Sequence, residues 1–248
     1  MCGRITLRTP AVRLIEMFVL PGIPLLIPRY NIAPTQMIVC VRSAAGHAAL
    51  REAIMMRWGL IPFWAKDRAI GNRMINARSE TVAEKPAFRQ AFTRRRCLIP
   101  IDGFYEWQKL SGGKKQPWLI ESQDEQPFAL AGIWESWCPP HDVSNTAEGP
   151  QSAESPLLSC SILTTSANEV MQPLHDRMPV ILPANAWETW LNAETRPSQL
   201  SSLLIPAENG LLKTTPVPAI VNNPRNSCEE LFNADGTLKP TSPSAESV

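Results

Sequence analysis

The chain has 248 residues, of which 44% are apolar, so it can bury the core of one large domain or two small ones. No stretch reaches the roughly 20 uncharged apolar residues of a membrane-spanning helix. The apolar segment 17–28 is interrupted by prolines and lacks a signal-peptide cleavage site, so we expect a cytoplasmic protein that does not bind membranes. The net charge of +1 gives no overall attraction to nucleic acid, and any such surface must come from local segregation of charge.

Proline is frequent, at 24 of 248 residues, which favours short strands and irregular connections over long helices. Apolar and β-branched runs predict strands at 4–8, 37–42, 53–60, 96–101, 117–121, 128–134, 159–165, 178–182 and 211–214. Helical periodicity predicts helices at 10–18, 79–92, 167–174 and 183–191, with Ser79, Asn168 and Asn185 as caps. The chain is therefore predicted to be a single α+β domain with a mostly antiparallel, barrel-like sheet and a few short helices.

Two segments differ in composition from the predicted domain, which spans residues 1–235. The stretch 139–156 is polar, rich in Ser, Pro and Glu, and without periodicity, so we expect a flexible insertion between strands. Residues 236–248 have the composition of a disordered tail. No internal repeat is present, and we expect a monomer.

The six cysteines are scattered, without a Cys-x-x-Cys pair. Neither a zinc site nor a disulfide scaffold has this spacing, and we expect no metal and no cofactor. Cys40, Cys97 and Cys160 lie in apolar runs and are predicted to be buried, unreactive thiols.

Cys2 is placed differently, because it follows the initiator methionine. A small second residue permits removal of Met1, which would leave an α-amine and a thiol on adjacent carbons. An α-amine has an ordinary pKa of about 7.7–8.0, so a useful fraction is neutral at pH 7 and can add to an aldehyde to form an imine. The thiol can then close a five-membered thiazolidine ring, helped by an intramolecular effective molarity on the order of 10⁵ M. Residue 2 taken alone favours the alternative, that Cys2 is an incidental small residue.

Seven short sequence blocks, spread along the chain, together carry a resemblance to a known family. They are Met1-Cys2-Gly3-Arg4, Arg29-Tyr30-Asn31-Ile32-Ala33-Pro34, Trp58-Gly59-Leu60-Ile61-Pro62-Phe63-Trp64, Ile75-Asn76-Ala77-Arg78-Ser79-Glu80-Thr81, Gly103-Phe104-Tyr105-Glu106-Trp107, His175-Asp176-Arg177-Met178-Pro179 and Val221-Asn222-Asn223-Pro224-Arg225-Asn226. In identity, order and spacing these blocks resemble the SRAP (SOS-response-associated peptidase-like) family, over residues 1 to about 233.

The resemblance implies a DNA damage response protein that binds abasic sites in single-stranded DNA and shields them through a covalent thiazolidine crosslink. By position, it implies Cys2 as nucleophile, Asn76 as a hydrogen-bonding partner of the linkage, Glu106 as general acid/base, and His175 in sugar opening or proton transfer. It further implies phosphate contacts by Arg4, Arg78 and Arg177, and a pocket shaped by Asn31, Pro34 and Thr164.

Elementary chemistry gives each implied role a reason and an alternative. Opening the closed abasic sugar and dehydrating the carbinolamine both move protons, which suits Glu106 and His175, and such help is typically worth 10²–10⁴-fold. Alternatively, Glu106 is an exposed strand carboxylate and His175 a loop histidine. Asn76 could lie at a helix entry. Arginine forks match phosphates, although most arginines form surface ion pairs.

Aromatic residues and charge runs add weaker signals. Trp64 and Phe63 lie in a Gly/Pro-interrupted loop before Asn76, where rings could stack on bases at about 1–3 kcal/mol each. Core packing is the alternative interpretation of these rings, and for Trp58 it is about as good as base stacking. The runs 94–96 and 114–115 are interpreted as solvated charge rather than DNA contacts.

Three other functions remain open. A cysteine-type peptidase that removes its own Met1 could use Cys2, Glu106 and His175, and it is the main alternative. An amino-terminal-nucleophile amidohydrolase also begins Met-Cys-Gly, but the Arg-Gly-Pro-Asp and early Asn-Gly segments of that class are missing. A non-catalytic single-strand binding module would use the same arginines and aromatics but would not need Cys2.

Overall fold

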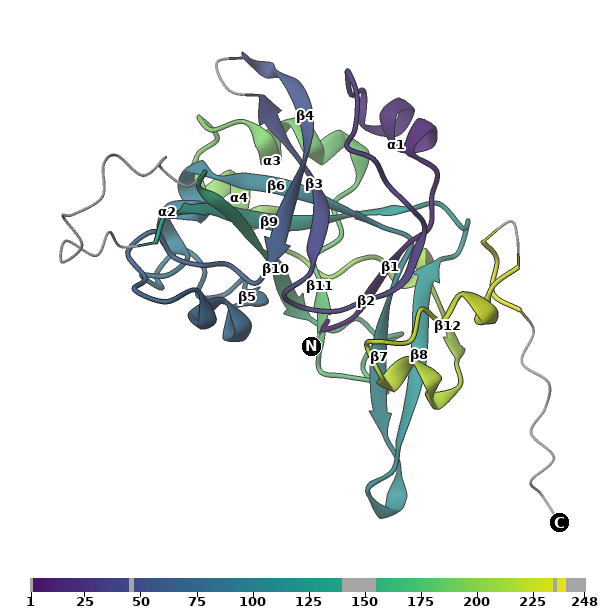
Figure 1. Cartoon of the computed structure of the whole chain (residues 1–248). Coiled ribbons are helices and arrows are strands. Elements are labelled where there is room, and N and C mark those ends of the chain that lie inside the picture. The colour runs from purple at the N-terminus through teal and green to yellow at the C-terminus, as the bar shows by residue number, and fades with distance from the viewer. Residues whose placement is uncertain (1, 45–46, 140–154, 234–235, 240–248) are drawn as a thin grey trace, which may run out of the picture.

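A computed structural model describes residues 2–44, 47–139, 155–233 and 236–239 (Figure 1). Its strands fall into two sheets. The strands are β1 (Ile5–Leu7), β2 (Arg29–Ile32), β3 (Met37–Ala44), β4 (His47–Trp58), β5 (Asn76–Arg78), β6 (Arg96–Ile101), β7 (Gly103–Lys109), β8 (Lys115–Ser122), β9 (Phe128–Trp137), β10 (Leu157–Ser166), β11 (Arg177–Pro179) and β12 (Leu212–Pro216).

The first sheet closes on itself as a barrel. Strands β10, β4, β3, β6 and β9 follow one another, and β9 pairs with β10 to complete the ring. The pairing of β10 with β4 is parallel, while the other four contacts of the ring are antiparallel. Strands β5 and β11 also pair with β10, beyond the ring. The prediction of a single α+β domain with a mostly antiparallel, barrel-like sheet is confirmed.

The second sheet is antiparallel, in the order β12-β8-β7-β1-β2. Strand β1 lies between β2 and β7, so the amino-terminal residues reach the interior of the molecule rather than its edge. Figure 1 shows the chain entering beside β7, while the β7–β8 hairpin extends well beyond the body of the molecule.

The helices are few and short: α1 (Ala11–Phe18), α2 (Arg89–Arg94), α3 (Trp187–Leu191) and α4 (Pro197–Ser202). None of the described helices is long and apolar enough to cross a membrane. Two helix predictions are wrong. The segment 79–92 is helical only from Arg89, because Pro86 lacks a donor and restricts the residue before it. The segment 167–174 forms turns around Pro173, and the Asn168 side chain accepts from the backbone N–H of Met171 at 3.0 Å.

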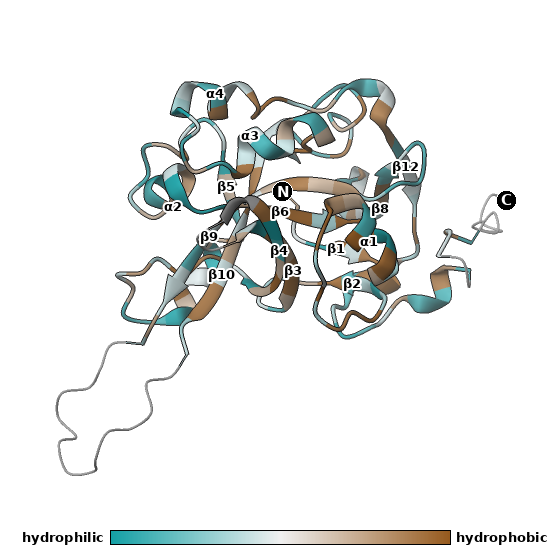
Figure 2. Ribbon diagram, turned by 90° about the horizontal axis from the view of Figure 1, so that it is seen from above, coloured by the Kyte–Doolittle hydropathy of each residue, from teal (hydrophilic) through white to brown (hydrophobic). Residues whose placement is uncertain are grey.

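The core fills the barrel and the space between the sheets, and Figure 2 shows apolar residues gathered on the barrel strands. Cys40, Cys97 and Cys160 are fully buried, as predicted. Trp58 is also fully buried, and its Nε1 donates to the backbone oxygen of Ile75 at 3.0 Å, which decides the alternative left open for this ring in favour of packing.

The charge run 94–96 is not a uniformly solvated surface. Arg96 is buried, and its guanidinium donates to the backbone oxygens of Phe92, Thr93, Trp190 and Asn192 at 2.5–2.7 Å. These carbonyls belong to the ends of α2 and α3, where helices leave acceptors without intrahelical partners. Burial lowers the pKa of Arg96 to about 10. This interpretation is therefore corrected for Arg96, which ties two helix ends to the barrel.

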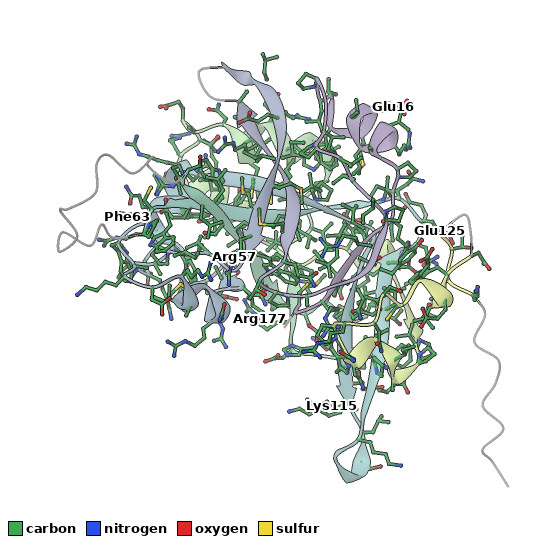
Figure 3. The ribbon with its side chains drawn as sticks, in the orientation of Figure 1. Glu16, Arg57, Phe63, Lys115, Glu125 and Arg177 are labelled. Atoms are coloured by element: carbon green, nitrogen blue, oxygen red, sulfur yellow. The ribbon has the colours of Figure 1, made fainter. Side chains whose placement is uncertain are left out.

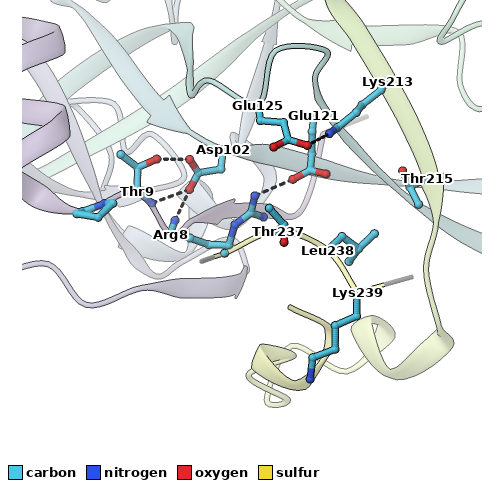
Figure 4. A pocket seen from close by; sticks show the side chains of 12 residues that line it. Arg8, Thr9, Asp102, Glu121, Glu125, Lys213, Thr215, Thr237, Leu238 and Lys239 are labelled. Carbon is cyan, nitrogen blue, oxygen red and sulfur yellow. Dashed lines mark hydrogen bonds and ion pairs between the residues drawn. The ribbon is translucent and has the colours of Figure 1, made fainter. Parts of the chain in front are cut away.

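Residues 229–233 and 236–239 pack beside Arg8, the residue that follows β1. Arg8 lies over the Phe232 ring at 4.5 Å and forms an ion pair with Glu121 at 2.7 Å, inside a polar pocket of about 470 Å³ (Figure 4). Leu238 bridges to Phe232, so residues 236–239, assigned from composition to the tail, take part in the fold. The rest of the predicted tail and residues 140–154 of the predicted insertion lie outside the described residues.

Candidate functional site

The site is centred on Cys2, which lies three residues before the start of β1 and is fully buried. Its backbone oxygen accepts a hydrogen bond from Nδ2 of Asn76 at 2.8 Å. Asn76 begins β5, which is held parallel to β10 in the register Ile162 to Asn76. Two segments that are 74 residues apart in sequence therefore meet at one hydrogen bond, and the asparagine positions the backbone of the cysteine.

Glu106 approaches Cys2 because β1 and β7 are antiparallel. Ile5 is opposite Phe104, and the backbone N–H of Tyr105 donates to the oxygen of Arg4 at 2.9 Å. Continuing this register brings the Glu106 position level with residue 3. The Glu106 side chain is only 3% exposed, which excludes the alternative of an exposed strand carboxylate.

The environment holds the Cys2 thiol in its neutral form. Burial raises the pKa of the Cys2 thiol well above its usual range, and the negative charge of Glu106 raises it further. A thiolate is therefore disfavoured here. A reaction at Cys2 therefore begins with a nucleophile other than the thiolate, or it needs a base that takes the thiol proton in a later step.

Arg177 and Thr164 lie on neighbouring strands next to this centre. Thr164 of β10 is fully buried, and its backbone oxygen accepts from Nη2 of Arg177 at 2.6 Å. Both ends of the Arg177 guanidinium fork onto the carboxylate of Glu80, the Nη2 bond being 2.9 Å long. This pairing lowers the pKa of Glu80. The arginine thus already holds an anion in the described structure.

The other two arginines have contrasting surroundings. Arg78 of β5 is exposed, and its side chain forms no hydrogen bond or ion pair within the described parts of the chain. Arg4 is buried, and its Nη1 donates to Oδ1 of Asn31 and to the backbone oxygen of Val221, both at 2.6 Å. Of the three predicted phosphate contacts, Arg78 presents the guanidinium that is open to a new anion.

Asn31 and Pro34 lie on the other side of Arg4. The Asn31 amide donates to the backbone oxygens of Asn223 (3.1 Å) and Asn226 (2.9 Å), so it fixes the loop that follows β12. Pro34 is half-buried just after β2. Asn31 thus shapes this side of the site through the backbone it holds.

His175 lies in the turn before β11, with its side chain 29% exposed. Its Nδ1 accepts from the backbone N–H of Arg177 at 3.0 Å and lies 2.7 Å from Oδ1 of Asp176. The two contacts alternate, because Nδ1 accepts only when unprotonated and donates only when protonated. The ring therefore has a defined partner in each protonation state, which suits a group that transfers a proton.

The aromatic loop after β4 is exposed. Trp64 and Phe63 have exposed fractions of 50% and 56%. Trp64, Lys66 and Arg73 help to line an open hollow of about 530 Å³. Exposed aromatic faces next to positive charge suit base stacking, and the stacking role of Trp64 stays a prediction.

Sequence reasoning missed Glu80 and the strand β7. Glu80 stands in the quoted block with Asn76 and Arg78, but its partner Arg177 lies 97 residues away, and no local signal joins them. Strand β7 was missed because its first four residues, Gly103 to Glu106, are all buried, so the alternation of polar and apolar residues is lost. Within the described residues, no cluster of three or more His, Cys, Asp or Glu side chains could hold a metal ion.

Comparison with known proteins bears on the whole chain. The family model described as SOS response associated peptidase (SRAP) matches residues 1–224. The abasic site processing protein YoaM of Bacillus subtilis is 41% identical over 96% of this chain and 100% of that protein. The abasic site processing protein HMCES of Gallus gallus is 34% identical over 73% of this chain and 56% of that protein.

Two solved structures have a similar fold. A crystal structure of a protein from Bacteroides thetaiotaomicron has a TM-score of 0.76 at 25% identity, over 91% of this chain and 97% of that one. One from Bordetella bronchiseptica has a TM-score of 0.72 at 26% identity, over 88% and 100% of the two chains. The family match, the relatives and the fold together show that this chain belongs to the SRAP family.

Proposed function

We propose that the protein recognises abasic sites in single-stranded DNA and bonds to them covalently through Cys2. The carrying observation is the joint position of Cys2, Asn76 and Glu106: a cysteine with a neutral thiol, its backbone held by an amide and a carboxylate beside it. Relatives that match this chain over nearly their whole length are named abasic site processing proteins, which supports the same substrate.

The reaction follows from an amine and a thiol on adjacent carbons. After Met1 is removed, the α-amine nitrogen adds to the aldehyde carbon of the opened sugar, and the carbinolamine loses its hydroxyl as water to give an imine. The Cys2 sulfur then bonds to the imine carbon while the thiol proton passes to the nitrogen. The net reaction is aldehyde plus aminothiol to thiazolidine plus water.

Glu106 and His175 would move the protons in this sequence. Glu106 can protonate the departing hydroxyl and accept the thiol proton, because its charge acts directly on Cys2. His175 would assist the opening of the sugar. Its Nδ1 has a donor, the backbone N–H of Arg177, when unprotonated and an acceptor, Asp176, when protonated. Asn76 would hold the linked residue in place through the Cys2 backbone oxygen.

The neutral thiol separates this function from the peptidase alternative. A cysteine peptidase attacks with a thiolate, whose pKa is usually lowered by an adjacent histidine. Here burial and Glu106 raise the pKa of Cys2, and no hydrogen bond joins Cys2 to His175 in the described residues. Amine-first chemistry needs no thiolate, so the geometry favours imine formation over thiol attack on an amide.

Intact-protein mass spectrometry before and after mixing with an abasic oligonucleotide tests the proposal. We expect the free protein to lack Met1, and the mixed sample to contain one adduct whose mass is protein plus DNA minus one water. An unmodified oligonucleotide is the control. Absence of an adduct from protein that has lost Met1 would refute the proposed function.

A separate prediction concerns Arg177, whose fork must leave Glu80 to hold a phosphate. Glu80→Gln should tighten binding to single-stranded DNA by up to about fivefold, since an exposed ion pair is worth at most about 1 kcal/mol. Arg78→Ala, which removes an open guanidinium, should instead lower the salt dependence of binding by about 0.7 log units per log unit of salt. Fluorescence anisotropy at several salt concentrations measures both. Weaker binding by Glu80→Gln would instead identify Glu80 as the residue that holds Arg177 in position.

A further inference from the structure

The β7–β8 hairpin continues past the site as a paired projection, residues 107–117, which we call the lysine arm. The strands remain paired out to Lys109 opposite Lys115, and the backbone N–H of Leu110 donates to the oxygen of Lys114 at 2.9 Å. Gly112 and Gly113 close the turn with φ values of 74° and 79°, which glycine adopts without strain. Figure 3 shows Lys115 on this projection, away from the body of the molecule.

The arm concentrates positive charge in a nearly neutral protein. Residues 107–117 contain three lysines and no acidic residue, so the other residues sum to −2 against the total of +1. Lys109, Lys114 and Lys115 are exposed, and none forms an ion pair within the described structure. Lys109 and Lys115 directly oppose each other across the strand pair, a placement of like charges that destabilises a hairpin. Fold stability does not account for this arrangement, whereas an anionic ligand would.

The base of the arm is fixed to the candidate site on both faces. On one face, Gln108 Nε2 donates to the backbone oxygen of Pro173, in the turn that carries His175, at 3.3 Å. On the other, Trp107 Nε1 donates to Oδ1 of Asn222 at 2.6 Å. Lys109 follows Glu106 by three residues, which places it about 10 Å farther along the strand, with its side chain on the face of Trp107 rather than that of Glu106. The lysines therefore stand at a set distance from the reacting centre.

We propose that the lysine arm binds the phosphate backbone of the nucleic acid on one side of the lesion. The inference rests on the proposed function, because the strand held at Cys2 must pass the arm if it leaves on that side. Lysine ammonium groups bind phosphates as point charges, so this contact is independent of sequence.

The test varies the length of DNA on each side of the abasic site. Lys109→Gln, Lys114→Gln and Lys115→Gln are combined in one variant. The matched control combines Arg13→Gln, Lys213→Gln and Lys239→Gln, which removes the same charge from α1, β12 and the carboxyl-terminal segment. Abasic oligonucleotides carry a flank of about two or about twelve nucleotides on either side, so that a long flank can extend along the whole arm and a short one cannot. Salt dependence of affinity and rate of crosslinking are measured for each.

We expect the salt slope of the arm variant to fall by up to about 2 log units, at about 0.7 per phosphate. The loss should occur with only one of the two long-flank oligonucleotides, the one whose long flank runs along the arm. Crosslinking of the short-flank substrate should stay at the wild-type rate, and the control variant should behave as wild type throughout. Annealing a complement to the long flank distinguishes a duplex from a single strand as the source of the phosphates.

Two results would overturn the inference. The first is a wild-type salt slope for the arm variant on every substrate, which would leave an acidic protein surface as the partner of the arm. The second is an equal loss of salt slope in the control variant. Failure of the wild-type protein to crosslink even the short-flank substrate is a different outcome, because it rejects the proposed function itself.

Discussion

Cys2→Ala is expected to abolish the heat-stable DNA adduct while leaving reversible DNA binding unchanged. Alanine keeps the α-amine and the backbone oxygen that Asn76 holds, so an imine can still form. It cannot close the ring, which removes an intramolecular step with an effective molarity on the order of 10⁵ M. The adduct that survives heating should therefore fall by orders of magnitude, whereas an imine trapped by borohydride should remain. Denaturing gels with and without borohydride measure the two species.

Cys138 offers a matched control for this experiment, because it is an exposed free thiol. Cys138→Ala should form the stable adduct at the wild-type yield. Retaining Met1, for example by a bulky residue at position 2, should remove both the imine and the ring. Wild-type yield of heat-stable adduct from Cys2→Ala would reject the thiazolidine mechanism.

Glu106→Gln should slow crosslinking by about 10²–10⁴-fold with little change in DNA affinity. Glutamine preserves the shape of this buried side chain but cannot cycle a proton. The same group serves both directions of one reaction, so release from a preformed adduct should slow as well. Adduct formation under single-turnover conditions, followed by a chase with unlabelled abasic DNA, gives the two rates.

An independent readout separates proton transfer from a structural role. Because the charge of Glu106 raises the pKa of Cys2, removing that charge should lower this pKa, and alkylation of Cys2 should rise at a lower pH. Glu121→Gln is the control, since Glu121 is also buried on the same sheet but pairs with Arg8. Wild-type crosslinking rates in both directions for Glu106→Gln would show that the carboxylate is structural.

Local pattern predicted the strands of the barrel better than its helices. The prediction at 96–101 coincides with β6, because a run of six buried residues is recognisable without its neighbours. The prediction at 79–92 is wrong because the helical periodicity of this segment runs through Pro86, and the proline determines the backbone there. Strand β4 starts earlier than predicted, at His47, because its first half is stabilised by pairing with β3 rather than by its own pattern.

For the site too, the sequence predicts some residues and not the contacts that depend on tertiary structure. The seven blocks include every residue now placed around Cys2 except Thr164, whose place follows from the pairing of β10 with β5 and β11. Their partners were not predictable, since the bonds from Arg177 to Glu80 and from Arg4 to Asn31 join segments that only tertiary structure brings together. The sequence favours solvated charge for the run 114–115, which lies in the lysine arm, because a charge run does not reveal what lies at the base of its hairpin.

The bond from Arg4 to the backbone of Val221 also constrains when the pocket can exist during biosynthesis. The two residues are 217 positions apart, and Asn31 likewise depends on Asn226. At about 5–20 residues per second, a ribosome needs roughly 10–40 s to add that length of chain. The amino terminus therefore emerges long before the segments that enclose it, so the proposed removal of Met1 would act on an unfolded chain. Enclosure of Cys2 would then follow this processing, and the nascent polypeptide would expose its α-amine before it can select a substrate.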